Sequence, residues 1–325
     1  MRDPGYMAMA VNEALRRLGH TGVVDPSAIR VLAGGMSGSA VIAFTLDGVP
    51  VVLKRTPASN RDATLMERAV REARFYRDLA ERVPVRTPRV LGSDLDPESG
   101  VLLLLAAHGL QPPLDAWAGE DYAEVAGELG RFHAAMREVV LPSWVGMASP
   151  QTAGQGLEAT RMWRDFARTT GLVAGAMLRQ MARTIARVVE IDAATGAGPL
   201  TLCHGDFHAG NLLRASDGAW VWADWQDVRI GPGVDDLSFF WQRAFAATDA
   251  ESEPTFTALV DAYWAGLAAT GDPGMSRAAF DRALAWSELR GWLLAWPPYL
   301  GYLSSTQQER VVARIAALLR DRVDR

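Results

Sequence analysis

The sequence predicts an α+β protein with a small sheet-rich N-terminal lobe and a larger, mainly helical C-terminal lobe. In the first third of the chain, short apolar segments of strand-like composition alternate with turn residues. After a polar, proline-rich stretch at residues 108–121, apolar residues recur mostly at the three- and four-residue spacing of helices. A chain of 325 residues also suits two lobes better than one small domain. We therefore expect an N-lobe over residues 1–107 and a C-lobe over residues 108–325.

The N-lobe is expected to be a sheet with one internal helix. Strands are predicted within residues 29–54, with a turn at Asp47-Gly48, and within residues 88–107, around an Asp/Pro/Gly turn. Between them, residues 62–83 have the apolar spacing of a helix. This helix would pack one stripe of apolar side chains against the sheet.

The C-lobe is expected to be mostly helical, with one loop held between two short strands. Helical spacing covers residues 120–138, residues 156–192 and most of the chain from residue 237 onward. Short strands are predicted at residues 200–205 and 219–225. Because loops on rigid supports commonly carry functional groups, the segment between these strands is the first candidate for a site.

Composition and charge exclude several classes of protein. The net charge of −5 shows no basic field for nucleic acid, and no apolar run is long enough to span a bilayer. Cys203 is the only cysteine, so no intramolecular disulfide and no cysteine-rich metal site can form. The N-terminus lacks the pattern of a signal peptide. We expect a cytoplasmic protein with no nucleic-acid or membrane partner; nothing in the sequence specifies its oligomeric state.

The densest group of chemically active residues is HGDFHAGN, residues 204–211. It contains Asp206 and Asn211, and Asp224 follows at the end of the next predicted strand. Carboxylate and amide oxygens suit Mg²⁺, which takes few protein ligands beside phosphate oxygens and water. In protein kinases an Asp of this kind orients the substrate hydroxyl, and an Asn and a second Asp hold the metal ions.

Two other interpretations of this segment remain open. His204 and His208 could bind zinc, although a third strong ligand is not obvious. The Asp and Asn residues could also serve only to form turns, where both residue types are common. Three oxygen-bearing groups at this separation favour the metal–phosphate interpretation over both alternatives.

A buried charge is predicted on the N-lobe helix. Glu72 completes the stripe formed by Leu65, Ala69, Tyr76, Leu79 and Val83. A carboxylate on a buried face requires a cationic partner, and Lys54 ends the strand just before this helix. The alternative is that Glu72 lies at the edge of the stripe and reaches water or Arg68.

Lys54 is itself unusual, because it is the single lysine of a chain with 32 arginines. A GC-rich codon bias would explain the missing lysines elsewhere, and retention of this one could be accidental.

A glycine-rich turn precedes Lys54 in the predicted sheet. The segment LAGGMSGSAVIAF, residues 32–44, brings glycines between two strands, where backbone N–H groups can approach phosphate oxygens. It is neither a Walker A loop nor a G-x-G-x-x-G motif. Ser37, Gly38 and Ser39 are the expected neighbours of a phosphate.

These segments together resemble the aminoglycoside phosphotransferase and choline kinase family, the small-molecule relatives of protein kinases. The resemblance covers residues 30–240 and is carried by VVLKR, REARFYRDLAE, LCHGDFHAGNLL, WADWQDV and GPGVDDLSFF. It implies a bilobal protein-kinase-like fold and phosphoryl transfer from ATP or GTP to a hydroxyl. Mg²⁺ would bridge the phosphates, and the protein would mainly position groups and spread charge.

The resemblance also implies roles for individual residues. Asp206 would be the catalytic base or hydroxyl-positioning residue, and Asn211 and Asp224 would hold Mg²⁺. Lys54 would contact the α- and β-phosphates, and Glu72 would fix Lys54.

Further roles follow from the same resemblance. Residues from Leu105 to Ala107 would form a hinge that binds the nucleobase through backbone groups, although the acidic residue common there in the family is missing. Asp236 would brace the catalytic loop. His204 and His208 would support that loop.

The acceptor is expected to bind the C-lobe, which is rich in aromatic residues. Eight of the 11 tryptophans lie from residue 220 onward. Aromatic faces suit rings, nucleobases and quaternary ammonium groups, but they also fill protein cores. The candidate acceptor contacts are Asp227, Trp241, Trp292, Trp296 and Tyr299.

The predicted function is phosphorylation of a small-molecule hydroxyl. The preferred acceptor is an antibiotic of sugar-containing or nucleoside type, in resistance or self-resistance. An alternative acceptor is choline, an amino sugar or a related metabolic alcohol. An alternative of another class is a nucleotide-binding regulator without turnover, which the complete set of motif residues disfavours.

Overall fold

The computed structural model describes residues 4–32, 39–59, 62–96, 98–107, 109–194, 199–247, 253–269 and 271–323. The chain divides into two compact units. Unit 1 comprises Met1–Pro112 and Gly210–Val228, and unit 2 comprises Pro113–Ala209 and Arg229–Arg325. The first boundary between the two units, after Pro112, lies a few residues beyond the lobe boundary predicted after residue 107. The second segment of unit 1 was not foreseen.

Backbone hydrogen bonds explain why Gly210–Val228 belongs to unit 1. Leu110 and Arg214 exchange two backbone bonds, of 3.1 and 2.8 Å. The N–H of Trp222 donates to the carbonyl oxygen of Arg86 at 2.8 Å. The candidate metal residues are therefore part of the sheet-containing unit, although they follow the first helices of unit 2 in the sequence.

Unit 1 is built around a five-stranded sheet of order β1-β2-β3-β5-β4, in which neighbouring strands are antiparallel. Its elements are α1 (Pro4–Arg17), β1 (Arg30–Val31), β2 (Ala40–Leu46), β3 (Val49–Thr56), α2 (Ala63–Asp78), β4 (Val90–Asp96), β5 (Gly100–Ala106), and the hairpin of β7 (Leu212–Arg214) and β8 (Trp220–Trp222). The turn between β2 and β3 is the predicted Asp47-Gly48, with φ of 50° and 79°. Two positive φ angles fit the tight hairpin turns that match strand twist.

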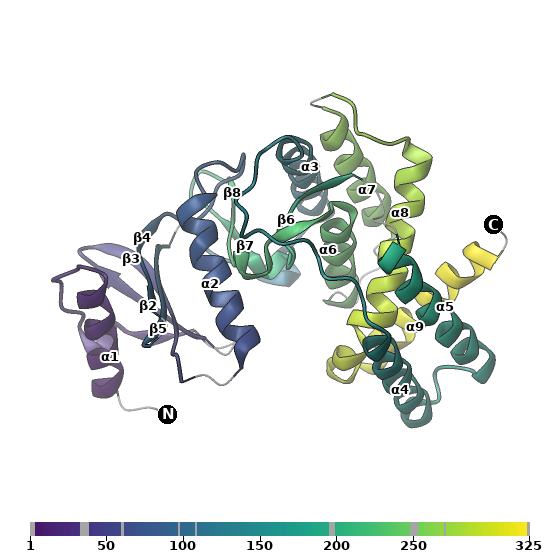
Figure 1. Ribbon diagram of the computed structural model, residues 1–325, viewed down its shortest axis with the longest axis horizontal. Helices are drawn as coiled ribbons and strands as arrows, with labels where there is room; N and C mark the ends of the chain where they lie inside the picture. Colours follow the sequence, from purple (N-terminus) through teal and green to yellow (C-terminus); the bar gives the residue numbers. More distant parts are fainter. Residues whose placement is uncertain are drawn as a thin grey trace. The chain divides into compact units, whose positions relative to one another are not determined.

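The two helices α1 and α2 cover opposite faces of this sheet (Figure 1). Leu15 of α1 and Leu53 of β3 lie in one buried cluster on the first face. Because successive strand residues point to opposite faces, the next residue, Lys54, faces α2. The sheet thus places its single lysine beside the helix that carries Glu72.

Unit 2 is mainly helical, with one two-stranded sheet of β6 and β9. Its elements are η2 (Leu114–Ala116), α3 (Gly119–Met136), α4 (Ala153–Thr170), α5 (Gly175–Ala194), β6 (Leu200–Cys203), β9 (Arg229–Pro232), α6 (Val234–Ala247), α7 (Glu253–Ala268), α8 (Arg277–Arg290), the π-helical turn η5 (Gly291–Ala295), η6 (Pro297–Tyr302) and α9 (Ser305–Val323). A large buried cluster joins residues of α4, α5, α6, α8, η5, η6 and α9. No described helix is both long and apolar enough to cross a membrane.

The helices differ from the sequence prediction at several points, and the helix expected over residues 62–83 ends at Asp78. The helical pattern at residues 156–192 is two helices, because Gly171 takes a left-handed conformation with φ 71° and ends α4. Helix α1 was not predicted, although the spacing of Val11, Ala14 and Leu15, all buried, is helical.

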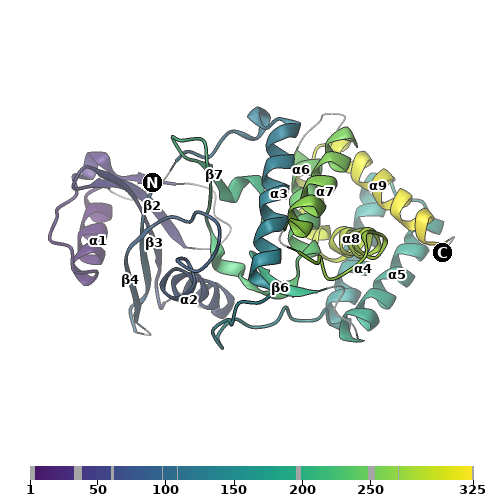
Figure 2. The same ribbon diagram turned by 90° about the horizontal axis from the view of Figure 1, so that it is seen from above.

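Helices α3 and α7 lie side by side and pack at very short range (Figure 2). A Cβ atom on Gly266 of α7 would lie 2.2 Å from the carbonyl oxygen of Gly127 on α3. Backbone cannot move aside as a flexible side chain can. Only glycine therefore permits this approach.

Gly266→Ala should destabilise the protein by roughly 1–3 kcal/mol through this overpacking. The gain in helix propensity, of about 0.5–1 kcal/mol, is too small to offset it. The midpoint of urea unfolding measures the effect. Gly301→Ala is the matched control, because a Cβ there meets nothing within 4 Å. Equal midpoints for the two variants would contradict this account of the α3–α7 contact.

Candidate active site

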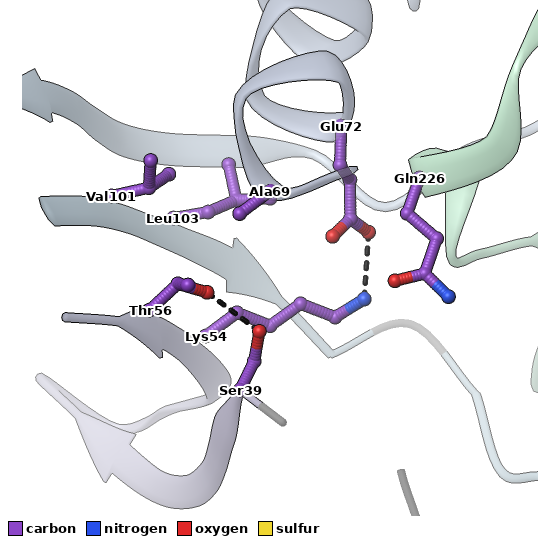
Figure 3. Close-up of a pocket in the computed structure, with 8 residues that line it drawn as sticks. All are labelled: Ser39, Lys54, Thr56, Ala69, Glu72, Val101, Leu103 and Gln226. Atoms are coloured by element: carbon purple, nitrogen blue, oxygen red, sulfur yellow. Dashed lines mark hydrogen bonds and ion pairs between the residues drawn. The ribbon is translucent and has the colours of Figure 1, made fainter. Parts of the chain in front are cut away.

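The ammonium of Lys54 lies between two carboxylates within unit 1. Its Nζ donates to Oε1 of Glu72 at 2.7 Å and to Oδ1 of Asp224 at 2.7 Å. Figure 3 shows the Lys54–Glu72 pair between β3 and α2. The predicted partner of Glu72 is confirmed, and the alternative of a Glu72 that reaches water or Arg68 is wrong. The link from Lys54 to Asp224 was not predicted, because sequence spacing does not show contacts between residues so far apart.

Burial and charge act against each other at this pair. The pKa of Glu72 is raised to about 7: burial is the main cause, the Asp224 carboxylate adds to the rise, and the Lys54 ammonium opposes it. Burial disfavours the charged form of Lys54, but the two carboxylates outweigh burial and raise its pKa above the ordinary value. We conclude that Lys54 is cationic, since two carboxylate oxygens at 2.7 Å stabilise its charge directly.

Asp224 and Asn211 flank the open end of the β7–β8 hairpin. The strands pair Leu212 with Trp222, and the N–H of Ala223 donates to the carbonyl oxygen of Asn211 at 2.9 Å. Asp224 follows in a left-handed conformation with φ 66°. Its carboxylate and the Asn211 amide are hard oxygen donors of the kind that Mg²⁺ prefers. The residues present therefore fit a magnesium site.

A pocket within unit 1 opens beside Lys54, and Figure 3 shows its lining. The polar side is formed by Ser39, Thr56, Lys54 and Glu72, together with Gln226 of the segment after Asp224. The hydroxyl groups of Ser39 and Thr56 are hydrogen-bonded at 2.6 Å. Ser39 thus lies where the sequence predicts a phosphate neighbour, while Ser37 and Gly38 lie outside the described residues. Thr56 was missed, and its position two residues after Lys54 on β3, on the same face, is the signal that could have found it.

The predicted hinge lies at the end of β5. Leu105 is buried in the strand, and the N–H of Ala107 donates to the carbonyl oxygen of Pro50 at 2.9 Å. That N–H group therefore already makes a hydrogen bond within the protein. A contact of Ala107 with a nucleobase would therefore use its carbonyl oxygen.

The loop that contains Asp206 is held within unit 2 by Asp236. The carboxylate of Asp236 accepts backbone N–H bonds from His204 at 2.6 Å and from Gly205 at 2.9 Å. Gly205 has φ 86°, a conformation that favours glycine and turns the chain into Asp206. The predicted bracing contact of Asp236 is present.

His133 supports Asp236 from the other side. Its Nε2 lies 3.4 Å from Asp236 Oδ2, and its Nδ1 lies 2.9 Å from the hydroxyl of Tyr263. All three residues are buried. Burial by itself raises the pKa of Asp236, but the hydrogen bond to His133, together with electrostatic interactions with His133, Arg229 and His204, outweighs burial, and the pKa is lowered overall.

Asp236→Asn should destabilise the folded protein by roughly 2 kcal/mol, because an amide cannot accept all the bonds that this carboxylate accepts. The lowered pKa means that the carboxylate stabilises the fold above its unfolded pKa near 3.8, and that this contribution is lost as pH falls through the folded pKa. Urea unfolding at pH 7 and at low pH measures both effects. Asp94→Asn, at a partly exposed surface pair, is the control. A loss at pH 7 no larger than that of the control would contradict the bracing role.

The structure disfavours a zinc site in this region. His208 Nε2 lies 3.7 Å from Asp206 Oδ1, and the Asp206 N–H donates to His204 Nδ1 at 3.3 Å. Among the described residues, the group close enough to bind a metal is instead His133, Cys203 and Asp236. Both ring nitrogens of His133 and the carboxylate of Asp236 are already engaged as described above. This group therefore acts as a support for the loop.

The predicted aromatic contacts of the acceptor fall into two groups. Trp241, Trp292 and Trp296 are 3%, 0% and 4% exposed, whereas Tyr299 is 37% exposed. The three tryptophans pack in the core of unit 2 and present little ring surface to a ligand. Their burial argues against the predicted acceptor contacts, and of these four aromatic residues Tyr299 alone exposes much of its ring.

A buried carboxylate, which the sequence analysis missed, lies among these tryptophans. Glu288 is 1% exposed and accepts indole N–H bonds from Trp241 and Trp292, each at 3.2 Å. Arg314 donates two bonds to the same carboxylate, at 2.8 and 2.7 Å. An acidic residue within the aromatic segment AWSELRGWLLAW was the available signal. The cluster orients the tryptophans by hydrogen bonds as well as by packing.

Asp227, the remaining acceptor candidate, lies against α2 in unit 1. Its Oδ1 accepts from Arg68 Nε at 2.9 Å, and Arg71 Nη1 lies 3.8 Å from the same oxygen. Its side chain is 18% exposed. The carboxylate is thus paired with arginines of its own unit.

Comparison with known proteins shows the family and the fold. A sequence model described as the phosphotransferase enzyme family matches residues 28–280. A search of curated proteins finds no match. The structure resembles that of amicoumacin kinase hAmiN in complex with AMP-PNP, Ca²⁺ and Ami, with a TM-score of 0.67, 13% identity, and coverage of 97% of this chain and 93% of that chain.

Two other solved structures show the same fold. Macrolide 2'-phosphotransferase MphH from Brachybacterium faecium has a TM-score of 0.55 and 19% identity, with coverage of 94% of this chain and 97% of that one. Choline kinase LicA from Streptococcus pneumoniae has a TM-score of 0.60 and 12% identity, with coverage of 97% of this chain and 99% of that one. At such low identity these likenesses concern the fold alone.

The predicted α+β, protein-kinase-like fold is confirmed, with a sheet-rich first unit and a helical second unit. Solved structures with this fold include kinases named for small molecules, amicoumacin and choline. The family match covers well over half of the chain, and the protein belongs to the phosphotransferase enzyme family.

Proposed function

We propose that this protein transfers the γ-phosphoryl group of ATP or GTP to a hydroxyl of a small molecule, and that the acceptor is an antibiotic of sugar-containing or nucleoside type. The observation that carries the proposal is the contact of Lys54 with Glu72 and Asp224 within unit 1. A partly buried lysine that joins the N-lobe helix to the residue expected to bind metal is the arrangement that phosphoryl transfer uses to hold a nucleoside triphosphate.

Each residue has a distinct task in the proposed reaction. Lys54 binds the α- and β-phosphates as a compact positive charge, and Glu72 keeps that charge in position. Ser39 contributes a hydroxyl beside the phosphates. Asp206 orients the acceptor hydroxyl and accepts its proton as the phosphoryl group is transferred.

Asn211 and Asp224 would hold Mg²⁺ through their side-chain oxygens. The metal, when bound, neutralises charge on the phosphates. Asp224, whose Oδ1 accepts from Lys54 Nζ at 2.7 Å, would offer its remaining oxygen sites to the metal. The left-handed φ of 66° at Asp224 sets the direction of its Cα–Cβ bond.

Two observations support an antibiotic as the acceptor. Tyr299 offers a partly exposed ring on η6, in the aromatic segment WPPYLGY. Two of the proteins with the same fold are named as an amicoumacin kinase and a macrolide 2'-phosphotransferase. Choline kinase has the same fold, so metabolic alcohols belong in the same test.

The test is incubation of the purified protein with Mg²⁺ and ATP or GTP, together with a panel of aminoglycoside, macrolide and nucleoside antibiotics, choline and amino sugars. Mass spectrometry should detect a gain of one phosphoryl group on an antibiotic. A gain on choline or an amino sugar alone would overturn the antibiotic acceptor. Nucleotide binding without modification of any acceptor would favour the regulator and contradict the proposal.

A further inference from the structure

The backbone of Asp224 must be held in place by its neighbours. Its φ of 66° lies in the left-handed region, which a residue other than glycine adopts at some cost. The short 3₁₀ helix η4 (Trp225–Asp227) follows directly, and the Asp224 side chain makes no capping bond to it. On the preceding side, the bond from Ala223 to Asn211 anchors the chain. The following side needs an equivalent anchor.

Helix α2 supplies that anchor through two arginines. Arg68 Nε donates to Oδ1 of Asp227 at 2.9 Å. Arg71 Nη1 donates to the carbonyl oxygen of Gln226 at 3.2 Å. Both bonds join consecutive residues of η4 to the same helix.

A stacked pair of aromatic rings and the contact of Lys54 with Asp224 also join α2 to the segment from Asp224 to Asp227. The rings of Phe75 and Trp225 have centroids 4.0 Å apart and planes 9° apart, and both side chains are fully buried. Glu72 lies one helical turn after Arg68, so the two residues project from one side of α2. That side therefore contacts Asp224 through Lys54 and contacts the three residues after Asp224 directly.

We propose that Arg68 and Asp227 are positioning residues of the nucleotide–metal site. Their ion pair holds η4 against α2 and thereby fixes Asp224 relative to Lys54 and Glu72. Asp227 then serves the metal-binding segment, and its role is not to contact the acceptor. The inference rests on the proposed function, in which Asp224 binds the metal that accompanies the nucleotide.

The burial and charge of Asp227 favour this role over acceptor binding. Its carboxylate is 18% exposed, and one oxygen is shared between Arg68 at 2.9 Å and Arg71 at 3.8 Å. A carboxylate neutralised by two arginines attracts a cationic acceptor weakly. It is well suited to hold a segment of its own unit.

The experiment measures ATP affinity by calorimetry, once with Mg²⁺ and once with EDTA, for the full-length protein. The variants are Arg68→Gln, Asp227→Asn and the double variant. Wild type should bind ATP more tightly with Mg²⁺ than with EDTA. In each single variant, the ratio of the ATP affinity with Mg²⁺ to the affinity with EDTA should be about tenfold smaller than in wild type. The affinity in EDTA should stay within about twofold of wild type. The double variant should lose no more than a single one, because both changes break one link.

Control variants separate positioning from general damage. Arg17→Gln breaks a comparable ion pair, in which Arg17 Nε lies 3.0 Å from Asp94 on the α1 side of the sheet, and it should keep the full Mg²⁺ gain. Urea midpoints are measured for every variant. If Arg68→Gln or Asp227→Asn does not fold, Arg68→Lys and Asp227→Glu replace them, and these should show a smaller loss of the same kind.

The outcomes distinguish this inference from the proposed function. A wild-type protein with no Mg²⁺-dependent gain, for ATP or GTP, would overturn the proposed function and this inference together. A normal wild-type gain that every variant keeps would overturn the inference alone. So would losses that add in the double variant, or an Asp227→Asn variant that changes only the KM of an identified acceptor.

Discussion

Asp206→Ala should reduce phosphoryl transfer by roughly 10²–10⁴-fold and leave nucleotide binding intact. Removal of a positioned proton acceptor costs about this much in rate. The backbone of the loop should keep its shape, because Asp236 holds it through the N–H groups of His204 and Gly205 rather than through the Asp206 side chain. Steady-state rates of acceptor modification, together with the Kd for Mg²⁺ and ATP, separate the two effects.

Asp281→Ala is a suitable control for this prediction. Asp281 is an exposed carboxylate of the same unit that pairs with Arg277, and its loss should not affect the rate. Turnover near the wild-type rate in Asp206→Ala would remove Asp206 from the proposed catalytic role. Loss of nucleotide affinity in parallel with rate would also contradict that role.

Lys54→Arg should fold normally and lose roughly 100-fold or more of the transfer rate, the cost expected when one charge-stabilising donor is misplaced. The Lys54 ammonium lies 2.7 Å from oxygens of both Glu72 and Asp224. A wider, planar guanidinium cannot occupy that point and also reach the phosphates as a compact charge does. The rate constant kcat at saturating nucleotide is the measurement.

The neighbouring residue gives a matched control for Lys54. Arg55→Lys exchanges the same two residue types at the next position of β3, which faces the other side of the sheet. It should leave kcat unchanged within about twofold. If Lys54→Arg behaves in the same way as this control, codon bias is a sufficient explanation for the single lysine.

The contact of Lys54 with Glu72 was predictable because two local periodicities determine it. The two-residue period of a strand and the 3.6-residue period of a helix each place one charge on a buried face. A buried charge needs a partner, and the chain offers one cation at the right place. The pairing of Lys54 with Glu72 could therefore be predicted without knowledge of the rest of the fold.

The return of Gly210–Val228 to unit 1 was not predictable in this way. The bonds between Leu110 and Arg214, and between Arg86 and Trp222, join segments more than a hundred residues apart. Local patterns show that a strand forms, but they do not show which distant strand or loop it joins. The contact of Asp224 with Lys54 was missed for the same reason.

The acceptor candidates show a second limit of sequence patterns. Trp292 and Tyr299 belong to the same aromatic segment, yet one is 0% and the other 37% exposed. The sequence shows that both side chains are aromatic, but tertiary packing determines which ring is buried. The ion pair of Asp227 with Arg68 likewise depends on how α2 lies against η4.

The most direct test of the account follows the γ-phosphoryl group itself. ATP or GTP labelled in that group is incubated with the protein, Mg²⁺ and the acceptor panel, and the label is traced. We expect that the label moves to a hydroxyl of an antibiotic, that the transfer requires Mg²⁺, and that Asp206→Ala stops it. Label that stays on the nucleotide, or appears only as inorganic phosphate with every acceptor, would contradict the assignment of this protein as a small-molecule kinase.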